Sequence, residues 1–199
     1  MSRLKAWLHQ PDQYEWITTF LRQRGMLRSA RIILVVVAGT SALVPLSVLP
    51  SQGQAGVVEV ITGVVAVTFT VGVTVLWLTR WPTRRQSQVG VVIGALCVGG
   101  WSFVQPTAAL AALACTAMAV TGGYIAFFHG PKLLLFNGVL AVAVVTAAVL
   151  RLAHEVNMAT AASAFWINTF LNLSVPLGIW GMSRAMPLSV VRTTDFAPL

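Results

Sequence analysis

The sequence predicts an all-α integral membrane protein, a six-helix transmembrane bundle with an amphipathic helix at its N-terminus. Hydrophobic residues make up 57% of the 199 residues and charged residues only 9%, whereas charged residues reach about 25% in soluble domains. The hydrophobic residues gather into separate runs, most of them near the length of about 20 residues that a helix needs to cross a bilayer. Lysine and arginine lie mostly between alternate runs. One domain embedded in a lipid bilayer is the expected architecture.

Residues 1–31 form a polar leader. Tyr14, Ile17 and Leu21 recur at helical spacing. Residues suited to the first turn of that helix are Pro11, Asp12 and Glu15. Gly25 is suited to its end, because glycine tolerates the left-handed conformation of a C-terminal cap. Two interpretations are open: an amphipathic helix on an anionic membrane face, or a solvated cap packed on the bundle.

Six apolar runs follow the leader and form a predicted transmembrane domain over residues 32–182. The predicted spans are residues 32–49, 57–78, 89–104, 108–128, 133–150 and 159–182. The third run is the shortest. Because the connections are only a few residues long, we expect consecutive helices to pack as antiparallel neighbours.

The distribution of positive charge predicts the orientation. Of thirteen lysines and arginines, six lie in the leader, three in the loop after the second run, one after the fourth run and two in the tail, which leaves Arg151 alone on the other side. Loops rich in lysine and arginine stay in the cytoplasm. We therefore expect a multi-pass protein of the cytoplasmic (inner) membrane with both termini in the cytoplasm.

Five polar residues within the spans, or at their ends, form the candidate intramembrane site: Glu59, Asn137, Arg151, Asn168 and Asn172. Such groups are costly in lipid and therefore suggest a function. Glu59 either reaches the outer interface or pairs with Arg151. Asn168 and Asn172 lie one turn apart on the last span, with Asn137 as a possible partner from the fifth. Amides of this kind usually join helices, and a binding pocket is the alternative.

Catalytic motifs are not apparent in the sequence. We identify no Ser/His/Asp or Cys/His arrangement, no phosphate-binding glycine loop and no pair of carboxylates within a span. The three histidines, His9, His129 and His154, fall in separate segments. We expect no enzymatic activity, cofactor or metal in this chain. The net charge of +8 is explained by topology rather than by nucleic acid, because it forms no stripe interleaved with aromatic residues.

Four strings of the sequence carry a family resemblance: residues 7–16, 21–25, 77–87 and 122–129. WPTRR at 81–85 and GYIAFFH at 123–129 are the more specific parts. With these strings the chain resembles the N-terminal membrane region of actinobacterial, mycobacterial-type GGDEF proteins, which are membrane-anchored diguanylate cyclases. Pro198 and Leu199 resemble the start of a GGDEF domain, with Ala197 where an acidic residue is common.

The resemblance implies a signalling role. In that family a C-terminal GGDEF domain makes cyclic di-GMP from GTP with magnesium, as a dimer, and its residues would follow Leu199. We therefore expect this chain to be the membrane anchor and sensory input module, with residues 183–199 as a cytoplasmic connector. The expected partners are the lipid bilayer and a second copy in a homodimer, and the ligand is unknown. The alternative is a small multi-spanning transporter or channel without an enzymatic role, which predicts a polar cavity lined by the three asparagines.

Overall fold

The computed structural model describes residues 3–48 and 56–194, and every regular element in those ranges is an α-helix. The helices are α1 (Arg3–Leu8), α2 (Tyr14–Gln23), α3 (Leu27–Val48), α4 (Val57–Thr79), α5 (Arg84–Phe103), α6 (Ala108–Cys115), α7 (Ala117–Phe128), α8 (Pro131–Glu155) and α9 (Met158–Thr194). The all-α prediction is confirmed for this part of the chain. Residue 49, the predicted end of the first span, and residues 195–199 of the predicted connector lie outside the described ranges.

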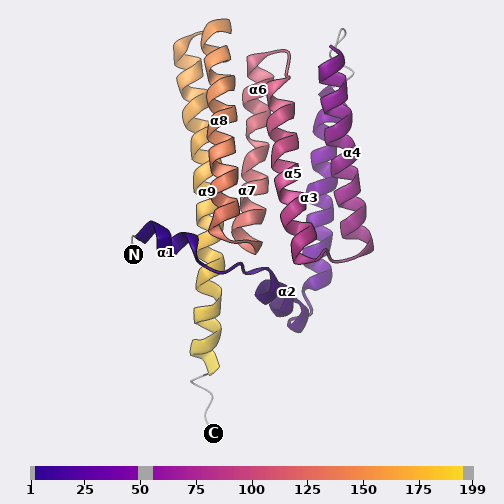
Figure 1. The fold of residues 1–199 in the computed structure, drawn as a ribbon, viewed down its shortest axis with the longest axis vertical. Coiled ribbons are helices and arrows are strands. Elements are labelled where there is room, and N and C mark those ends of the chain that lie inside the picture. Colours follow the sequence, from indigo (N-terminus) through magenta and orange to yellow (C-terminus); the bar gives the residue numbers. More distant parts are fainter. Residues whose placement is uncertain (1–2, 49–55, 195–199) are drawn as a thin grey trace.

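Helices α3 to α9 run along the long axis of the molecule, while α1 and α2 lie across one end of the bundle, and α9 extends past them (Figure 1). Four helical segments are long and apolar enough to cross a membrane: Val57–Thr79, Ala108–Phe128, Pro131–Glu155 and Met158–Ala185. They agree with four of the six predicted spans. Helices α3 and α5, of 22 and 20 residues, correspond to the other two predicted spans. That these two helices cross the membrane stays a prediction.

Two helices extend beyond the predicted spans. α5 begins at Arg84 rather than at residue 89, because Thr83 caps it. Oγ1 of Thr83 accepts a hydrogen bond from the N–H of Gln86 at 3.3 Å, and Oε1 of Gln86 accepts one from the N–H of Thr83 at 3.0 Å, a reciprocal capping box. α9 continues past residue 182 to Thr194, so the connector begins as a direct continuation of the last span.

The fourth span, predicted as one continuous helix, is interrupted at Thr116, between α6 and α7. The N–H of Thr116 donates to the carbonyl of Leu113 at 3.1 Å, and the N–H of Ala119 donates to the carbonyl of Thr116 at 3.1 Å. This i to i+3 spacing is that of a 3₁₀ turn. In a regular α-helix the N–H of Ala119 would bond the carbonyl of Cys115. The turn therefore leaves the carbonyl of Cys115 without its usual partner.

The buried side-chain clusters of the long helices lie among α5 to α9. One buried cluster joins α6 and α8 through small side chains: Ala111, Ala112, Cys115, Val144, Val145 and Ala148. Small residues let helix backbones approach closely in a membrane. At Gly122 of α7 the approach of α9 is so close that an added Cβ would lie 2.7 Å from Pro176. The α3–α4 hairpin stands at the edge of this group (Figure 1).

The leader lies against the end of the bundle. Tyr14, Ile17 and Leu21 of α2 are buried and pack on Phe128 at the end of α7, which agrees with the interpretation of the leader as a packed cap. Gly25 has a φ of +67°, the left-handed conformation that was predicted there, and α2 ends at Gln23. Pro11 and Asp12 precede α2, whereas Glu15 lies in its first turn.

Candidate functional site

Asp12, in the segment between α1 and α2, is bound on both carboxylate oxygens. Oδ2 accepts hydrogen bonds from Nδ1 of His129 and from Nε2 of Gln88, each at 3.0 Å. Oδ1 accepts the backbone N–H of Tyr14 at 2.9 Å and lies 3.6 Å from Nε of Arg84. The side chain of Asp12 is only 7% exposed. These contacts fasten the leader to both α5 and the end of α7.

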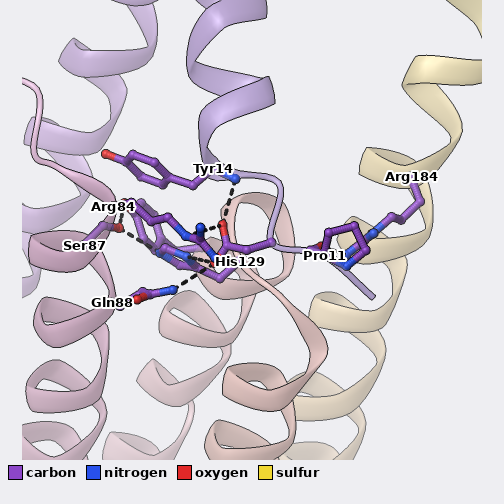
Figure 2. A network of polar contacts seen from close by, with 9 residues as sticks. Pro11, Tyr14, Arg84, Ser87, Gln88, His129 and Arg184 are labelled. Atoms are coloured by element: carbon purple, nitrogen blue, oxygen red, sulfur yellow. Dashed lines mark hydrogen bonds and ion pairs between the residues drawn. The ribbon is translucent and has the colours of Figure 1, made fainter. Parts of the chain in front are cut away.

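The hydrogen bonds continue from His129 into the bundle. Nε2 of His129 lies 2.8 Å from Oγ of Ser87, which in turn lies 2.7 Å from Oη of Tyr124. The His129 side chain is fully buried and its ring stacks on that of Tyr14, with 5.5 Å between the ring centroids. Figure 2 shows Ser87, Gln88 and His129 gathered around the leader segment. We name Asp12, Ser87, Gln88 and His129 the leader clamp.

Local structure places each member of the leader clamp. The capping box at Thr83 starts α5 early, so that Ser87 and Gln88 fall just after its first turn and face the leader. α7 ends at Phe128, and His129 follows in an extended conformation. The leader backbone passes close to the next residue, since a Cβ on Gly130 would lie 3.6 Å from the carbonyl oxygen of Gln10.

The electrostatics of Asp12 favour its charged form. Burial works to raise the pKa of this carboxyl, but the hydrogen bonds from His129, from the backbone of Tyr14 and from Gln88 outweigh it, and the pKa lies below its ordinary value. Burial also raises the pKa of Tyr14, whose hydroxyl donates to the carbonyl of Pro82. The leader clamp therefore holds an ionised Asp12 beside a neutral phenol.

The row from Asp12 through His129 to Ser87 has the order of a serine hydrolase triad, an arrangement that the sequence analysis did not find. Such a triad also needs N–H donors for the oxyanion of the intermediate. Here the N–H of Ser87 donates to the carbonyl of Thr83, and the N–H of Gln86 donates to Oγ1 of Thr83. Both of these amides are occupied, and the contacts of the row join the leader to α5 and to the end of α7.

A second set of contacts joins the leader to α9. Nη2 of Arg184 donates to the carbonyl of Pro11 at 3.1 Å, and Figure 2 shows the Arg184 side chain extending from α9 toward Pro11. The Arg184 guanidinium also lies 5.4 Å from the ring centroid of Trp180, and the ring of Trp7 meets Trp180 edge-on, with 6.0 Å between centroids. The leader therefore holds α9 near the point where this helix leaves the bundle.

Two of the three predicted asparagines bond the backbone at the interruption between α6 and α7. Nδ2 of Asn172 donates to the carbonyl of Cys115 at 3.3 Å, the group that the 3₁₀ turn leaves free, and Nδ2 of Asn137 donates to the carbonyl of Met118 at 3.3 Å. Nδ2 of Asn168 bonds within its own helix. All three side chains are buried, and within the described ranges Oδ1 of each has no hydrogen-bond partner.

The two charged candidates do not join the asparagines or each other. The carboxylate of Glu59 accepts the N–H of Gly56 at 2.8 Å, at the start of α4. Arg151 instead lies 3.7 Å from Glu155 and donates to the carbonyl of Gln105 at 3.0 Å. Of the two interpretations of Glu59, pairing with Arg151 is therefore wrong, because each group has a nearer partner at its own helix end.

Metal binding finds no support in the described ranges. Within residues 3–48 and 56–194, no three His, Cys, Asp or Glu side chains gather closely enough to hold an ion.

Comparisons with protein families, with characterised proteins and with solved structures find no match to this chain. The resemblance to GGDEF proteins therefore rests on the sequence strings alone and stays a prediction.

The leader clamp is the site that sequence reasoning missed. Asp12 and His129 are 117 positions apart, and Ser87 and His129 are 42 apart, so no local spacing connects them. The one available signal was the T-x-x-Q capping pattern at Thr83, which predicts a helix start and would have placed Ser87 near the beginning of α5.

Proposed function

We propose that this chain is the membrane anchor and sensory input module of a signalling protein, and that α9 carries its output. The observation behind the proposal is that α9 is a single helix of 37 residues. At 1.5 Å per residue it is about 55 Å long, whereas the hydrocarbon core of a bilayer is about 30 Å thick. The helix extends past the leader end of the bundle (Figure 1), so a shift of α9 inside the membrane would move the connector directly.

The proposal includes six membrane spans with both termini in the cytoplasm of the cell. Helices α3, α4, α5, α6 with α7, α8 and α9 would be the spans. Support comes from the charges, because the leader end carries Arg31, Arg84 and Arg184, all in contact with other parts of that end, whereas Arg151 bonds the α5–α6 loop at the opposite end. Membrane proteins keep their arginine-rich end in the cytoplasm.

The leader supplies a candidate for the moving part. It is attached to the bundle by Asp12 and to α9 by Trp7 and by the Arg184 bond to Pro11. A signalling module needs an element with two arrangements whose balance an input can shift. Docked and released states of the leader would hold or free α9 at its exit.

The output domain in this proposal is a GGDEF domain that follows residue 199 and makes cyclic di-GMP from GTP and magnesium. Two copies of the chain would bring two such domains together as a homodimer. In the chain as given no residue has a catalytic role in this proposal. Purified protein of 199 residues is therefore expected to make no cyclic di-GMP, and detectable synthesis would contradict the proposal.

The test is a fusion in which an active GGDEF domain follows Leu199. We expect the Asp12→Asn substitution to change the cyclic di-GMP production of reconstituted fusion protein severalfold, because it weakens the docking of the leader on the bundle, and the docked leader holds α9. Glu15→Gln is the matched control, since Glu15 is an exposed acid on the same leader. Equal production by the Asp12→Asn, Glu15→Gln and unchanged fusions would overturn the role of α9 as the output element.

Transport is the second candidate, and the interrupted fourth span favours it. Many transporters bind substrate where a helix is broken near the middle of the membrane. The break at Thr116 lies beside Asn137 and Asn172, and Oδ1 of each is buried without a partner in the described part of the chain. These oxygens could coordinate a small polar solute or a cation.

A vesicle experiment separates the two candidates. If the chain is a transporter, replacing both Asn168 and Asn172 by alanine should abolish the uptake of small cations into proteoliposomes. Leu177→Ala, an exposed position on the same helix, is the control. Uptake that is unchanged by the double replacement, or not above that of empty vesicles, would remove the transport candidate.

A further inference from the structure

A groove of about 270 Å³ lies between the α3–α4 hairpin and the side of the bundle formed by α5, α6 and α7. Its walls are mostly apolar, with Phe69 and Val73 from α4, Val98 from α5 and Val120 from α7. Along α5 its lining runs from Gln86 to Trp101, about 22 Å at 1.5 Å per residue. A long alkyl chain could lie along such a groove, but a compact polar solute would leave most of it empty.

Glycine keeps the groove open near one end. A Cβ added to Gly90, which lines the groove, would have no atom within 4 Å. One turn further along α5, a Cβ on Gly94 would lie 3.3 Å from the ring of Phe69. The space beside Gly90 is thus not filled by any described side chain, although the same helix packs tightly a turn later.

The end of the groove near Gly90 is polar and meets the leader clamp. Tyr124, Ser87 and Gln86 all line it. Oη of Tyr124 lies 2.7 Å from Oγ of Ser87, which continues to His129. Oε1 of Gln86 is used in the helix cap, which leaves its amide nitrogen as a donor. An apolar groove with hydrogen-bonding groups at one end fits an amphiphile, a molecule with an apolar chain and a polar head group.

The hydrogen-bond directions define the head group. Because Asp12 is an acceptor, Nδ1 of His129 carries a proton. With a neutral imidazole, Ser87 donates to Nε2 and Tyr124 donates to Ser87, so the phenol oxygen offers only lone pairs to the groove. With a protonated imidazole each bond reverses, and the Tyr124 hydroxyl can donate into the groove. A hydroxyl head can both donate and accept, so it fits either state.

From these observations we infer that the groove binds a single-chain amphiphile with a neutral hydroxyl head, of the long-chain alcohol class. The hydroxyl lies between Tyr124 and Gln86, and the chain lies along α5 toward Trp101. A carboxylate head fits less well, because it cannot donate and because an ion at an apolar site loses its hydration without gaining a charged partner there. The inference goes beyond the proposed function, since binding does not depend on whether α9 transmits a signal.

Photolabelling tests the inference. The full chain is reconstituted in phosphatidylcholine vesicles with hexadecanol that carries a photoreactive diazirine at the far end of its chain, and labelled peptides are mapped by mass spectrometry. We expect label on the α4, α5 and α7 segments around the groove, competed by unlabelled hexadecanol. The methyl ether of hexadecanol should compete several times more weakly, because it has lost the donor.

Two glycine variants provide the matched comparison. Gly90→Leu fills the groove and should abolish the competed labelling. Gly100→Leu adds the same side chain to the same helix, also where a Cβ meets nothing within 4 Å, but away from the groove lining, and should leave labelling unchanged. Tyr124→Phe should weaken competition by about five- to tenfold, the effect of one hydrogen bond. Elution as a single sharp peak in detergent verifies that each variant folds.

Three results would overturn the inference: equal labelling of the Gly90→Leu and Gly100→Leu variants, equal competition by the alcohol and its ether, or label spread evenly around the lipid-facing helices. The assay measures binding alone. Failure of the signalling proposal would be seen separately, in the cyclic di-GMP output of the fusion protein.

Discussion

The α3–α4 hairpin and the group formed by α6 to α9 are built from similar apolar residues, yet they pack very differently. α4 buries only Gly63, Ala66 and Trp77 among its 23 residues, whereas α7 buries seven of its 12. In lipid, apolar side chains gain little from leaving their surroundings, so close packing depends on small residues that let backbones approach. On the face that the hairpin turns to the bundle, Phe69 and Val73 of α4 line a groove that remains open.

The difference teaches that hydrophobicity places a helix in the membrane, while side-chain size decides where it is held. The tightly packed group carries the fixed parts, including the helix interruption at Thr116 and the asparagines around it. The looser hairpin borders the one region in the described chain where we infer a ligand. The leader clamp lies between the two and touches both α5 and the end of α7.

The largest difference between the two regions is expected from adding side chains to glycine. At Gly122 an added Cβ would lie 2.7 Å from Pro176 and 2.9 Å from Nδ2 of Asn137, so Gly122→Val should lower the free energy of unfolding by about 3 kcal/mol, as overpacking does. Gly72→Val in the hairpin meets no atom within 4 Å and should have little effect. Thermal unfolding in detergent measures both, and equal losses would break the comparison.

A smaller effect is expected at the leader clamp. Asp12→Asn weakens the bond to His129 and removes the charge that Arg84 and Gln88 face. Docking of the leader should weaken by about 2 kcal/mol, a usual value for hydrogen bonds to a charged group. Hydrogen exchange of residues 14–23 is the measurement. Glu15→Gln is the control, and a similar increase in exchange in both variants would contradict the role of Asp12.

Protonation of Asp12 should also weaken the docking of the leader. The loss should be no greater than in the Asp12→Asn variant, because protonation removes the same charge. The pKa of Asp12 in the docked leader lies below the ordinary value of about 3.9. Docking is therefore at full strength above that ordinary value and is lost as the pH falls through the lower pKa. The protection factor of the leader amides, which compares the intrinsic with the observed exchange rate at the same pH, should stay constant from pH 7 to about 5 and fall only under stronger acid. An Asp12→Asn protein should not show that acid transition.

The smallest effect sharpens the comparison between the two regions. Val144 of α8 is 1% exposed and packs in the cluster that joins α6 and α8, whereas Val65 of α4 is 53% exposed. Val144→Ala should cost about 1 kcal/mol through the cavity it leaves, and Val65→Ala less than about 0.5 kcal/mol, as at most exposed positions. Unfolding in detergent should rank them in that order, and the reverse order would contradict the assignment of the packed face.

Several parts of the fold could be predicted because they depend on local sequence. The apolar runs at 57–78, 108–128, 133–150 and 159–182 coincide with the segments that can cross a membrane, since length and hydropathy are properties of one segment. Gly25 ends the first amphiphilic pattern as expected. The interruption at Thr116 was missed, because nothing in an alanine-rich run marks a 3₁₀ turn.

The candidate site was less predictable because its residues are distant in sequence. Glu59 and Arg151 were expected as possible partners from their similar depth, but each has a nearer partner one helical turn away or less, Gly56 for Glu59 and Glu155 for Arg151. The sequence analysis did not predict Asp12 and Ser87 as site residues, since an acid and a hydroxyl near helix starts usually serve as local caps. Their meeting with His129 depends on the starts of α2 and α5 lying level with the end of α7.

By itself the sequence determined that this protein is helical and that at least four of its segments are apolar enough to cross a bilayer, because helix formation and partition into lipid depend on neighbouring residues along one stretch of chain. Only the tertiary structure decided which polar groups meet. The bond between Asp12 and His129 joins positions whose distance is set by packing. The groove beside Gly90 exists because the α3–α4 hairpin does not close on the bundle, which no single helix shows alone.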